Sequence, residues 1–298
     1  MTYSASPATR AFAARQGVDL DAVARETGRH SLAREDIERH LGKAGPNADN
    51  MREDVTRYWD VDHAEYGPIR EEPLSRVDLV AIANLTAANA AIPQVTHHDR
   101  ADVRAIETFR ARMKPQADER GLRLSALAFH VMALARCLVE HPKVNASLSP
   151  GADRLILKDY VHIAIAIDTP HGLVVPVIRD ADRKGLWQIA GEISDLAERA
   201  QSRKLRPDEM GGASMTISNL GGIGGIGFTP LVNPPEVAIL GLSRTQTVPV
   251  WQDDGWMPVP MVPLDLSYDH RVVNGADAAR FLVRHAQLIG DPRLLVAG

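Results

Sequence analysis

The sequence has 298 residues, enough for one large domain or for a medium domain with a small one. Hydrophobic residues make up 45% and charged residues 24% of it, with a net charge of −4, which is typical of a globular protein and gives no indication of nucleic-acid binding. It contains no run of about 20 apolar residues that would cross a membrane. Cys and His residues nowhere have the spacing of a zinc site, so no metal is predicted.

Residues 1–42 have the pattern of a small all-α unit. Ser6, followed by a proline, predicts the start of a helix that ends at Gly17. A short apolar turn is expected at 18–23, then a polar loop and a second helix at 34–41. Two short helices and a loop bury little apolar surface, so we expect this unit to be marginally stable.

Residues 43–68 are polar and punctuated by Gly, Pro and Asn, which predicts a linker. The remainder, 69–298, mixes helical and strand periodicities. Helices are predicted at 76–91, 103–120, 125–141, 185–201 and 275–289, and strands at 94–103, 154–158, 161–168, 172–178, 214–220, 236–242 and 259–268. The two strands within 161–178 have no helix between them and are predicted to form a hairpin. This indicates an α+β domain with a large mixed sheet.

Cys137 is the single cysteine of the chain. One cysteine excludes an internal disulfide and favours a cytoplasmic location, where thiols stay reduced. It lies in the apolar run SALAFHVMALARCL, so a buried structural thiol is expected rather than a nucleophile.

Glycines at 222, 224 and 227 formally satisfy the dinucleotide-binding pattern G-x-G-x-x-G. That fold needs a helix to begin at the glycine loop, whereas the continuation FTPLVNPPEVAIL contains three prolines and then a strand. We therefore predict a glycine-rich turn that permits a close backbone approach.

His270 lies between a predicted strand and a predicted helix, where catalytic groups are often displayed. The ordinary pKa of histidine suits a general base, but the chain has 11 histidines, and a structural role for any one of them is the commoner outcome. Asn274 has an ordinary role available as the cap of the following helix, with Asp277 at the third helical position. From the residues alone, both interpretations stay open.

The segment SYDHRVVNGADAARFL resembles the C-terminal signature H-x-x-x-D-G of the dihydrolipoamide acyltransferases of 2-oxo acid dehydrogenase complexes. The resemblance continues over 69–296, where further family motifs occur in order. They are IPQVTHHDRADVRAIETFR, KDYVHIAIAIDTPHGLVVPVIRDAD and TISNLGGIGGIGFTPLVNPPEVAILGLS. Within the family, the sequence is most like the acetyl-transferring members of bacterial pyruvate dehydrogenase complexes.

The resemblance implies a chloramphenicol-acetyltransferase-like fold, with homotrimers whose active sites lie between subunits. It implies that His270 is the general base that activates the thiol of coenzyme A, and that Ser218 donates a hydrogen bond to the oxyanion of the attacked thioester. Asn274 stands where the family usually has Asp; an amide keeps hydrogen bonds there but cannot accept a proton.

The N-terminal unit resembles the peripheral-subunit-binding domain of the same complexes in SPATRAFAARQGVDL and REDIERHL. This implies docking, through Arg10 and Arg29, of dihydrolipoamide dehydrogenase or of the decarboxylating component. The loop before the second helix departs from the family, because Ser31 stands at its arginine position. No lipoyl domain precedes this unit, so either the chain is truncated or the lipoyl group is supplied in trans by another domain or subunit.

Ala297 stands where these acetyltransferases carry the large apolar residue that joins trimers into a cube, so we expect trimers without cubic assembly. Two alternatives to acetyl transfer remain. One is transfer of a different acyl group in an acetoin- or branched-chain-type complex. The other is a catalytically weak structural core, against which the presence of both His270 and Ser218 argues.

Overall fold

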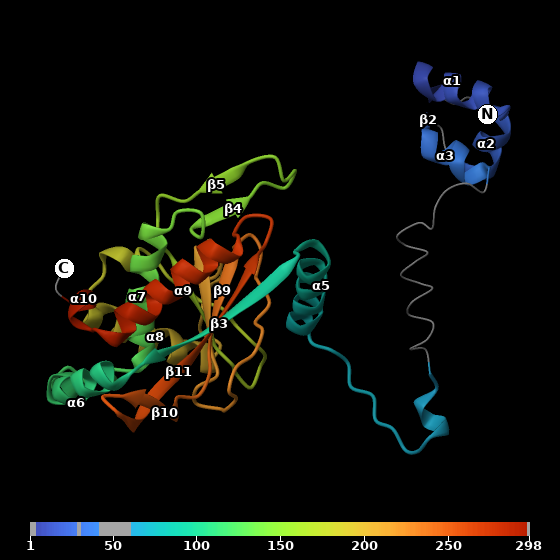
Figure 1. The fold of residues 1–298 in the computed structure, drawn as a ribbon. Coiled ribbons are helices and arrows are strands. Elements are labelled where there is room, and N and C mark those ends of the chain that lie inside the picture. The colour runs from blue at the N-terminus through green and yellow to red at the C-terminus, as the bar shows by residue number, and fades with distance from the viewer. Residues whose placement is uncertain (1–3, 29–30, 42–60, 297–298) are drawn as a thin grey trace. The chain divides into compact units, whose positions relative to one another are not determined.

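The computed structural model describes residues 4–28, 31–41 and 61–296. The chain forms two compact units, Met1–Pro73 and Leu74–Gly298, and each is described by itself (Figure 1). The domain boundaries predicted near residues 42 and 68 stay predictions. None of the helices in the described part of the chain combines the length and apolar character that a membrane span requires.

Residues 4–28 and 31–41 of the first unit form α-helices and a short parallel strand pair. The helices are α1 (Pro7–Gln16), α2 (Leu20–Thr27) and α3 (Arg34–His40), and the strands are β1 (Ser4–Ala5) and β2 (Ser31–Leu32). The predicted caps of α1 are confirmed: the Ser6 side chain accepts from the Thr9 N–H at 3.1 Å, and Gly17 closes the helix in the left-handed region at φ 67°.

The turn expected at 18–23 was wrong, because most of that segment is the first half of α2. The Asp19 carboxylate accepts from the Asp21 N–H at 3.0 Å and caps the start of α2, and Gly28 ends the helix at φ 65°. The inward face of this helix buries Val23 and Ala24 against Leu32. This segment is too short to be recognised as a helix by its periodicity. The caps at both ends and the burial of one face stabilise it as a helix.

The five helices predicted in the second unit are confirmed. They are α5 (Arg76–Ala91), α6 (Arg104–Glu119), α7 (Ala126–Glu140), α8 (Leu186–Gln201) and α9 (Gly275–Gly290). A short helix, α10 (Arg293–Val296), follows near the end of the described residues. Figure 1 shows α5 standing beside the start of β3, apart from the other helices of this unit.

A seven-stranded mixed sheet forms the centre of the second unit, as predicted. Its strands are β3 (Gln94–Asp102), β6 (Ile163–Ala166), β7 (Val177–Ile178), β8 (Met215–Asn219), β9 (Ala238–Leu242), β10 (Gln246–Gln252) and β11 (Gly255–Asp269). Their order is β10-β11-β9-β8-β6-β7, and β3 pairs with β11 as well. β6, β8 and β9 run parallel, and the other pairs are antiparallel. The predicted hairpin is confirmed, with Ile163 opposite Ile178.

Two strand features were missed by the periodicity. β4 (Ala146–Leu148) was not predicted and pairs with β5 (Leu155–Leu157), which confirms the strand predicted at 154–158. The second missed feature is β10, which forms a hairpin with the first half of β11. The sequence of β10, QTVPVWQ, has polar ends and a central proline, so it lacks the apolar run that marks the other strands.

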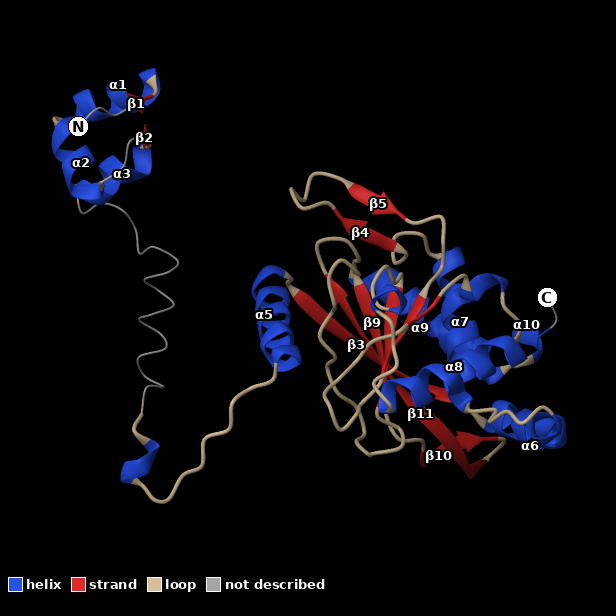
Figure 2. Cartoon of the chain, turned by 180° about the vertical axis from the view of Figure 1, so that it is seen from behind, coloured by secondary structure: helices blue, strands red, loops and turns tan. Residues whose placement is uncertain are grey.

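The two faces of the sheet differ in character because alternate residues of a strand point to opposite sides. Leu264, Leu266 and Tyr268 of β11 lie in the main core with side chains of α7, α8 and α9, which cover that face (Figure 2). Asp265 and Ser267, between them, point to the opposite face and are also buried. This second face, the polar face, carries Asp265 and Ser267 beside small apolar clusters that include Ala164 and Ile239.

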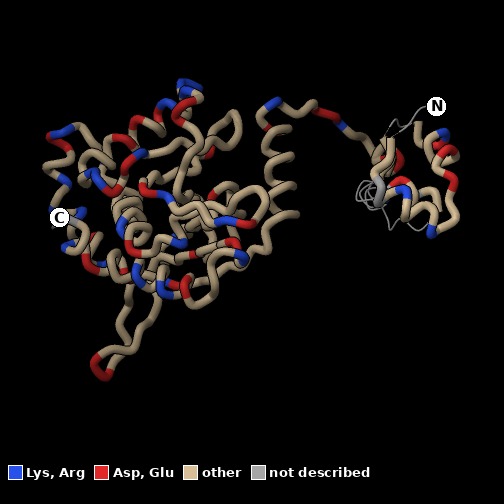
Figure 3. Tube along the Cα trace, turned by 90° about the horizontal axis from the view of Figure 1, so that it is seen from above, with Lys and Arg blue, Asp and Glu red and all other residues tan. Residues whose placement is uncertain are grey.

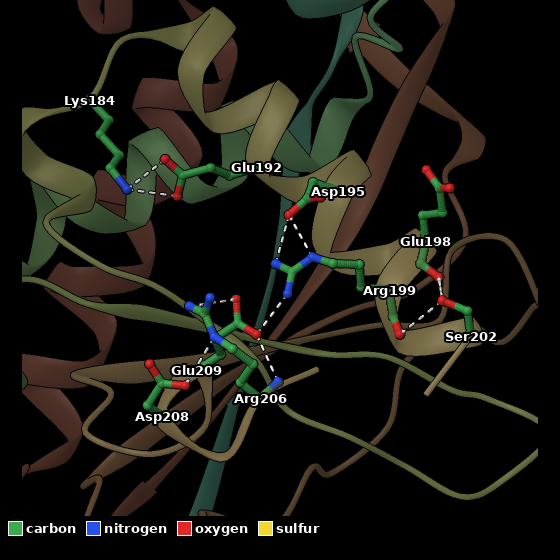
Figure 4. Close-up of polar contacts among 9 residues, drawn as sticks. All are labelled: Lys184, Glu192, Asp195, Glu198, Arg199, Ser202, Arg206, Asp208 and Glu209. Carbon is green, nitrogen blue, oxygen red and sulfur yellow. Dashed lines mark hydrogen bonds and ion pairs between the residues drawn. The ribbon is translucent and has the colours of Figure 1, made fainter. Parts of the chain in front are cut away.

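Ion pairs fix the end of α8 to the segment that follows it (Figure 4). Arg199 contacts Asp195 one turn earlier at 2.6 Å and Glu209 beyond the helix at 2.7 Å. The arginine lowers the pKa of Glu209 to about 2, so this carboxylate stays charged at neutral pH. Elsewhere, Lys and Arg are interspersed with Asp and Glu along the trace (Figure 3).

Cys137 lies on α7 and is fully buried, as expected of a structural thiol. Burial raises its pKa to about 12. The thiol is therefore protonated at any physiological pH.

Two buried histidines face each other between α7 and α9. The Nδ1 atom of His130 lies 3.0 Å from the Nε2 atom of His285, and the rings stack with centroids 5.3 Å apart. Burial lowers the pKa of His130 to about 4 and that of His285 well below its ordinary value. Both imidazoles are consequently neutral in the folded protein.

We expect the free energy of unfolding to fall as the pH drops from about 6.5 to 4. In this range His130 and His285 bind protons in the unfolded chain but stay neutral in the folded protein. The lowered pKa of His130 corresponds to about 3 kcal/mol over this window. Urea unfolding at several pH values, for the wild type and for the His130→Leu, His285→Leu double variant, measures the difference. His141→Gln, at the end of α7, is the matched control, and equal pH slopes for wild type and double variant would contradict the expectation.

Candidate active site

Asp269, the last residue of β11, holds the loop that carries His270. The buried Asp269 carboxylate pairs with the Arg271 guanidinium at 2.6 Å, and its Oδ1 also accepts from the Arg271 N–H at 3.0 Å. The N–H groups of Val272 and Val273 donate to the Asp269 carbonyl at 3.0 Å. These hydrogen bonds fix the path from β11 into α9, and His270 lies in the turn between them.

His270 itself is exposed. Its backbone N–H donates to the Pro93 carbonyl at 3.1 Å, and its ring lies 5.7 Å from the ring of the buried Tyr268. Within the described residues its imidazole nitrogens have no hydrogen-bond partner, so both are available to a bound molecule. The predicted position in a strand-to-helix loop is confirmed.

Asn274 caps α9, as predicted. Its Oδ1 accepts from the Asp277 N–H at 2.8 Å, at the third helical position. This hydrogen bond occupies the side-chain oxygen and leaves the amide NH2 group exposed on the same loop as His270.

Ser218 lies near the end of β8 on the polar face of the sheet. It is half-buried, and among the described residues its hydroxyl has no hydrogen-bond partner. It is opposite Ala166 of β6 on one side and Gly241 of β9 on the other. A half-buried hydroxyl without a partner in the protein can donate to a ligand.

One chain does not bring Ser218 and His270 together. The register places Ser218 level with Gly241, and Gly241 level with Asp265 of β11. His270 lies five residues further along the chain, which is about 17 Å along the strand direction, and two strands to the side. Within one chain the two residues therefore lie at opposite ends of the sheet.

Phe228 is a neighbour of Ser218 that the sequence reasoning missed. A Cβ atom at position 241 would lie 2.8 Å from the Phe228 ring, so the ring rests directly on the Gly241 backbone. Since Gly241 is level with Ser218, the ring stands beside the serine. The signal in the sequence was the glycine inside the apolar strand EVAILGL, which marks a close approach.

The glycine loop takes the form predicted for it. No helix follows it in the described chain; residues 221–236 run as turns and irregular structure into β9. Gly224 and Gly225 adopt φ values of 155° and 86°, of which the second lies well inside the region that favours glycine. This contradicts a dinucleotide-binding arrangement.

Glu236 is a second residue that the sequence reasoning missed. It is 5% exposed, and its carboxylate accepts from the Thr216 hydroxyl at 2.7 Å. Burial raises its pKa to about 7, although Thr216, Asn233 and Lys158 each act in the opposite direction. The carboxyl group therefore titrates near neutral pH, and its partner Thr216 lies two residues before Ser218 on β8.

Of the two arginines predicted to bind a partner, the structure describes Arg10 only. Arg10 is exposed on α1, where its Nε donates to the Ala5 carbonyl at 3.1 Å. Arg29 lies outside the described residues.

Comparison with known proteins identifies the class of this fold and site. The family model for 2-oxoacid dehydrogenases acyltransferase (catalytic domain) matches residues 66–297. The acetyltransferase component of the pyruvate dehydrogenase complex of Pseudomonas aeruginosa is 43% identical over 98% of this chain and 54% of its own length. The chain belongs to the 2-oxoacid dehydrogenase acyltransferase family.

Two solved structures are similar to the second unit. One is the dihydrolipoamide acetyltransferase of Azotobacter vinelandii, studied for the roles of a serine, a histidine and an asparagine in its catalytic mechanism. The other is the cubic core of a pyruvate dehydrogenase multienzyme complex. Each is 48% identical, with a TM-score of 0.78, and covers 79% of this chain and 97% of the other. The chain spans about half the length of the curated relatives it matches, 54% and 47% for two of them.

We expect Gly241→Ala to destabilise the second unit by about 1–3 kcal/mol, because the new methyl group would displace the Phe228 ring. Urea unfolding of the full chain measures this. Gly255→Ala is the matched control, since the nearest atom to a Cβ there is the Gln252 carbonyl oxygen at 3.9 Å. If both variants unfold like the wild type, the ring does not rest on Gly241.

Proposed function

We propose that the chain transfers an acetyl group between dihydrolipoamide and coenzyme A in a 2-oxo acid dehydrogenase complex. The observation that carries the proposal is the set Ser218, His270 and Asn274. These residues have the same spacing along the chain as the serine, histidine and asparagine studied in the Azotobacter vinelandii enzyme. The unpartnered Ser218 hydroxyl and the exposed His270 ring support the same assignment.

In this mechanism His270 takes the proton of the coenzyme A thiol, which is mostly protonated at neutral pH. The thiolate sulfur attacks the carbonyl carbon of S-acetyldihydrolipoamide, and Ser218 donates to the resulting oxyanion. Collapse breaks the bond to the dihydrolipoamide sulfur, which receives the proton from His270. Ser218 forms no covalent bond to the acetyl group, and Asn274 holds the loop by capping α9.

The separation of Ser218 from His270 within one chain supports a homotrimer in which each site takes its serine and its histidine from different copies. Helix α5 supports the same assembly. It exposes large apolar side chains on several sides, and a helix that is apolar all round is normally covered. These side chains are Val77, Leu79, Val80, Ile82 and Leu85.

The choice of acetyl over a larger acyl group is supported by the relatives of Pseudomonas aeruginosa and Azotobacter vinelandii, both of which are acetyltransferase components. The Ser218 hydroxyl argues against a purely structural core, because it has no hydrogen-bond partner among the described residues and can donate to a substrate.

Replacing either residue should abolish most of the activity, and co-expressing the two variants should restore part of it. We expect His270→Ala to lower turnover by about 10²–10⁴-fold and Ser218→Ala by about 10²-fold. Mixed trimers of the two variants contain one intact site of three, so trimers that carry both variants should have about a third of the wild-type activity.

The measurement is acetyl transfer from acetyl-coenzyme A to free dihydrolipoamide by the co-expressed, doubly tagged protein. Two differently tagged copies of His270→Ala are the control and should stay inactive. Mixed trimers without recovered activity would mean that the two residues act from the same chain.

For the first unit we propose a peripheral-subunit-binding role, in which α1 presents Arg10 to an acidic surface of dihydrolipoamide dehydrogenase or of the decarboxylating component. The Arg10 side chain is exposed, and its contact with Ala5 uses Nε, so the terminal guanidinium nitrogens face outward. The lipoyl group is proposed to come from another domain or subunit. The expectation that trimers do not form a cube rests on Ala297, which lies outside the described residues, and stays a prediction.

We expect Arg10→Ala to weaken binding of dihydrolipoamide dehydrogenase by about tenfold, and wild-type affinity to fall as salt rises. Calorimetry with the full chain measures both. Arg15→Ala, which removes the same charge from the last turn of the same helix, is the matched control. The role would be abandoned if neither partner component binds at low salt.

A further inference from the structure

A buried carboxylate and an exposed imidazole form a pair on the polar face of the sheet that the proposed mechanism does not use. The Asp265 side chain is 3% exposed, and its Oδ1 lies 2.7 Å from Nδ1 of His98, whose side chain is 58% exposed. Within the described residues, Nε2 of His98 has no partner. The hydrogen bond to the imidazole therefore offsets part of the free-energy cost of burying the carboxylate.

The same carboxylate holds the glycine loop, residues 221–228. Its Oδ2 accepts from the Phe228 N–H at 3.1 Å, and a Cβ at Gly227 would lie 3.3 Å from Oδ1. Arg244 holds the loop at an earlier point by donating to the Ile223 carbonyl at 2.7 Å. Asp265 thus anchors the end of the loop that carries the Phe228 ring.

Asp265 and Ser218 belong to one row of residues that runs across the strands of the sheet. The register puts His98 opposite Asp265, Asp265 opposite Gly241, and Gly241 opposite Ser218. Residues directly opposite one another in neighbouring strands point to the same face. The Phe228 ring rests on Gly241, between the Asp265 carboxylate that holds its backbone and the Ser218 hydroxyl beside it.

We propose that Asp265 and His98 are positioning residues for acyl transfer, which seat the glycine loop on the sheet and hold Phe228 against Gly241 beside Ser218. The inference rests on the proposed function for its catalytic consequence. Its structural part, the anchoring of the loop, stands by itself. A displaced ring would widen the space at Ser218 and loosen the placement of the thioester carbonyl, to which turnover is sensitive.

The chain contains a matched comparison for this pair. Two residues along the same two strands, and therefore on the same face, the Thr96 and Ser267 hydroxyls hydrogen-bond at 2.7 Å. That pair joins β3 to β11 as His98 and Asp265 do, but it has no contact with the loop among the described interactions. A role limited to joining the two strands would give both pairs the same importance.

The test combines amide hydrogen exchange and steady-state kinetics on the full chain, with the variants Asp265→Ala, Asp265→Asn, His98→Gln and Ser267→Ala. We expect Asp265→Ala to speed exchange of the 221–228 amides by roughly tenfold or more and to lower kcat for acetyl transfer by about tenfold. Asp265→Asn keeps an acceptor for the Phe228 N–H, and His98→Gln keeps a donor to Asp265, so both should recover most of the protection and the activity. Ser267→Ala should leave loop exchange and kcat as in the wild type.

Unchanged loop exchange in Asp265→Ala, or an equal effect of Ser267→Ala, would overturn the proposal. Should Asp265→Ala fail to fold, His98→Ala decides it, because this variant removes the side chain that hydrogen-bonds the Asp265 carboxylate. We expect it to speed exchange within the loop, and unchanged loop exchange would overturn the proposal. A wild-type chain without acetyl transfer would end the proposed function instead, and the exchange measurement would still report on the anchor.

Discussion

Alternation of side chains along β11 is the constraint on which the second unit depends. This strand pairs with β10, β9 and β3, so its backbone holds these three strands together. Its apolar residues enter the core beneath α7 and α9, and the residues between them supply Asp265 and Ser267 to the other face. A shift of one residue in its register would exchange the two sets and place carboxylates in the core.

The direction of the strands explains why the candidate site is divided. β8 and β9 run parallel, and β11 runs against them, so the end of β8 and the end of β11 lie at opposite edges of the sheet. Ser218 and His270 each follow the ordinary preference of functional groups for strand ends and adjoining loops. The strand pairing within one chain therefore separates Ser218 from His270. This separation supports a site that combines Ser218 of one copy with His270 of another.

Local features were predictable from the sequence, and contacts across strands were not. Helices α6 to α9 have long periodic patterns, and Asn274 and Gly17 are caps that act within one turn. Helix α2 escaped because its eight residues are fewer than the 11–18 over which a helical period is recognised. The positions of Phe228 on Gly241 and of His98 on Asp265 depend on which strands are neighbours, which no pattern within a segment encodes. For the same reason Ser218 had only the family resemblance to mark it.

The state of Cys137 has a consequence for chemistry carried out around this protein. Its thiol is fully buried and, with a pKa of about 12, almost never a thiolate. Because thiol–disulfide exchange and alkylation proceed through the thiolate, the folded chain is inert to both. A protein proposed to work between two thiol substrates therefore offers them no sulfur of its own with which to form a mixed disulfide. Any thiol titrated in the presence of the native protein belongs to the substrates.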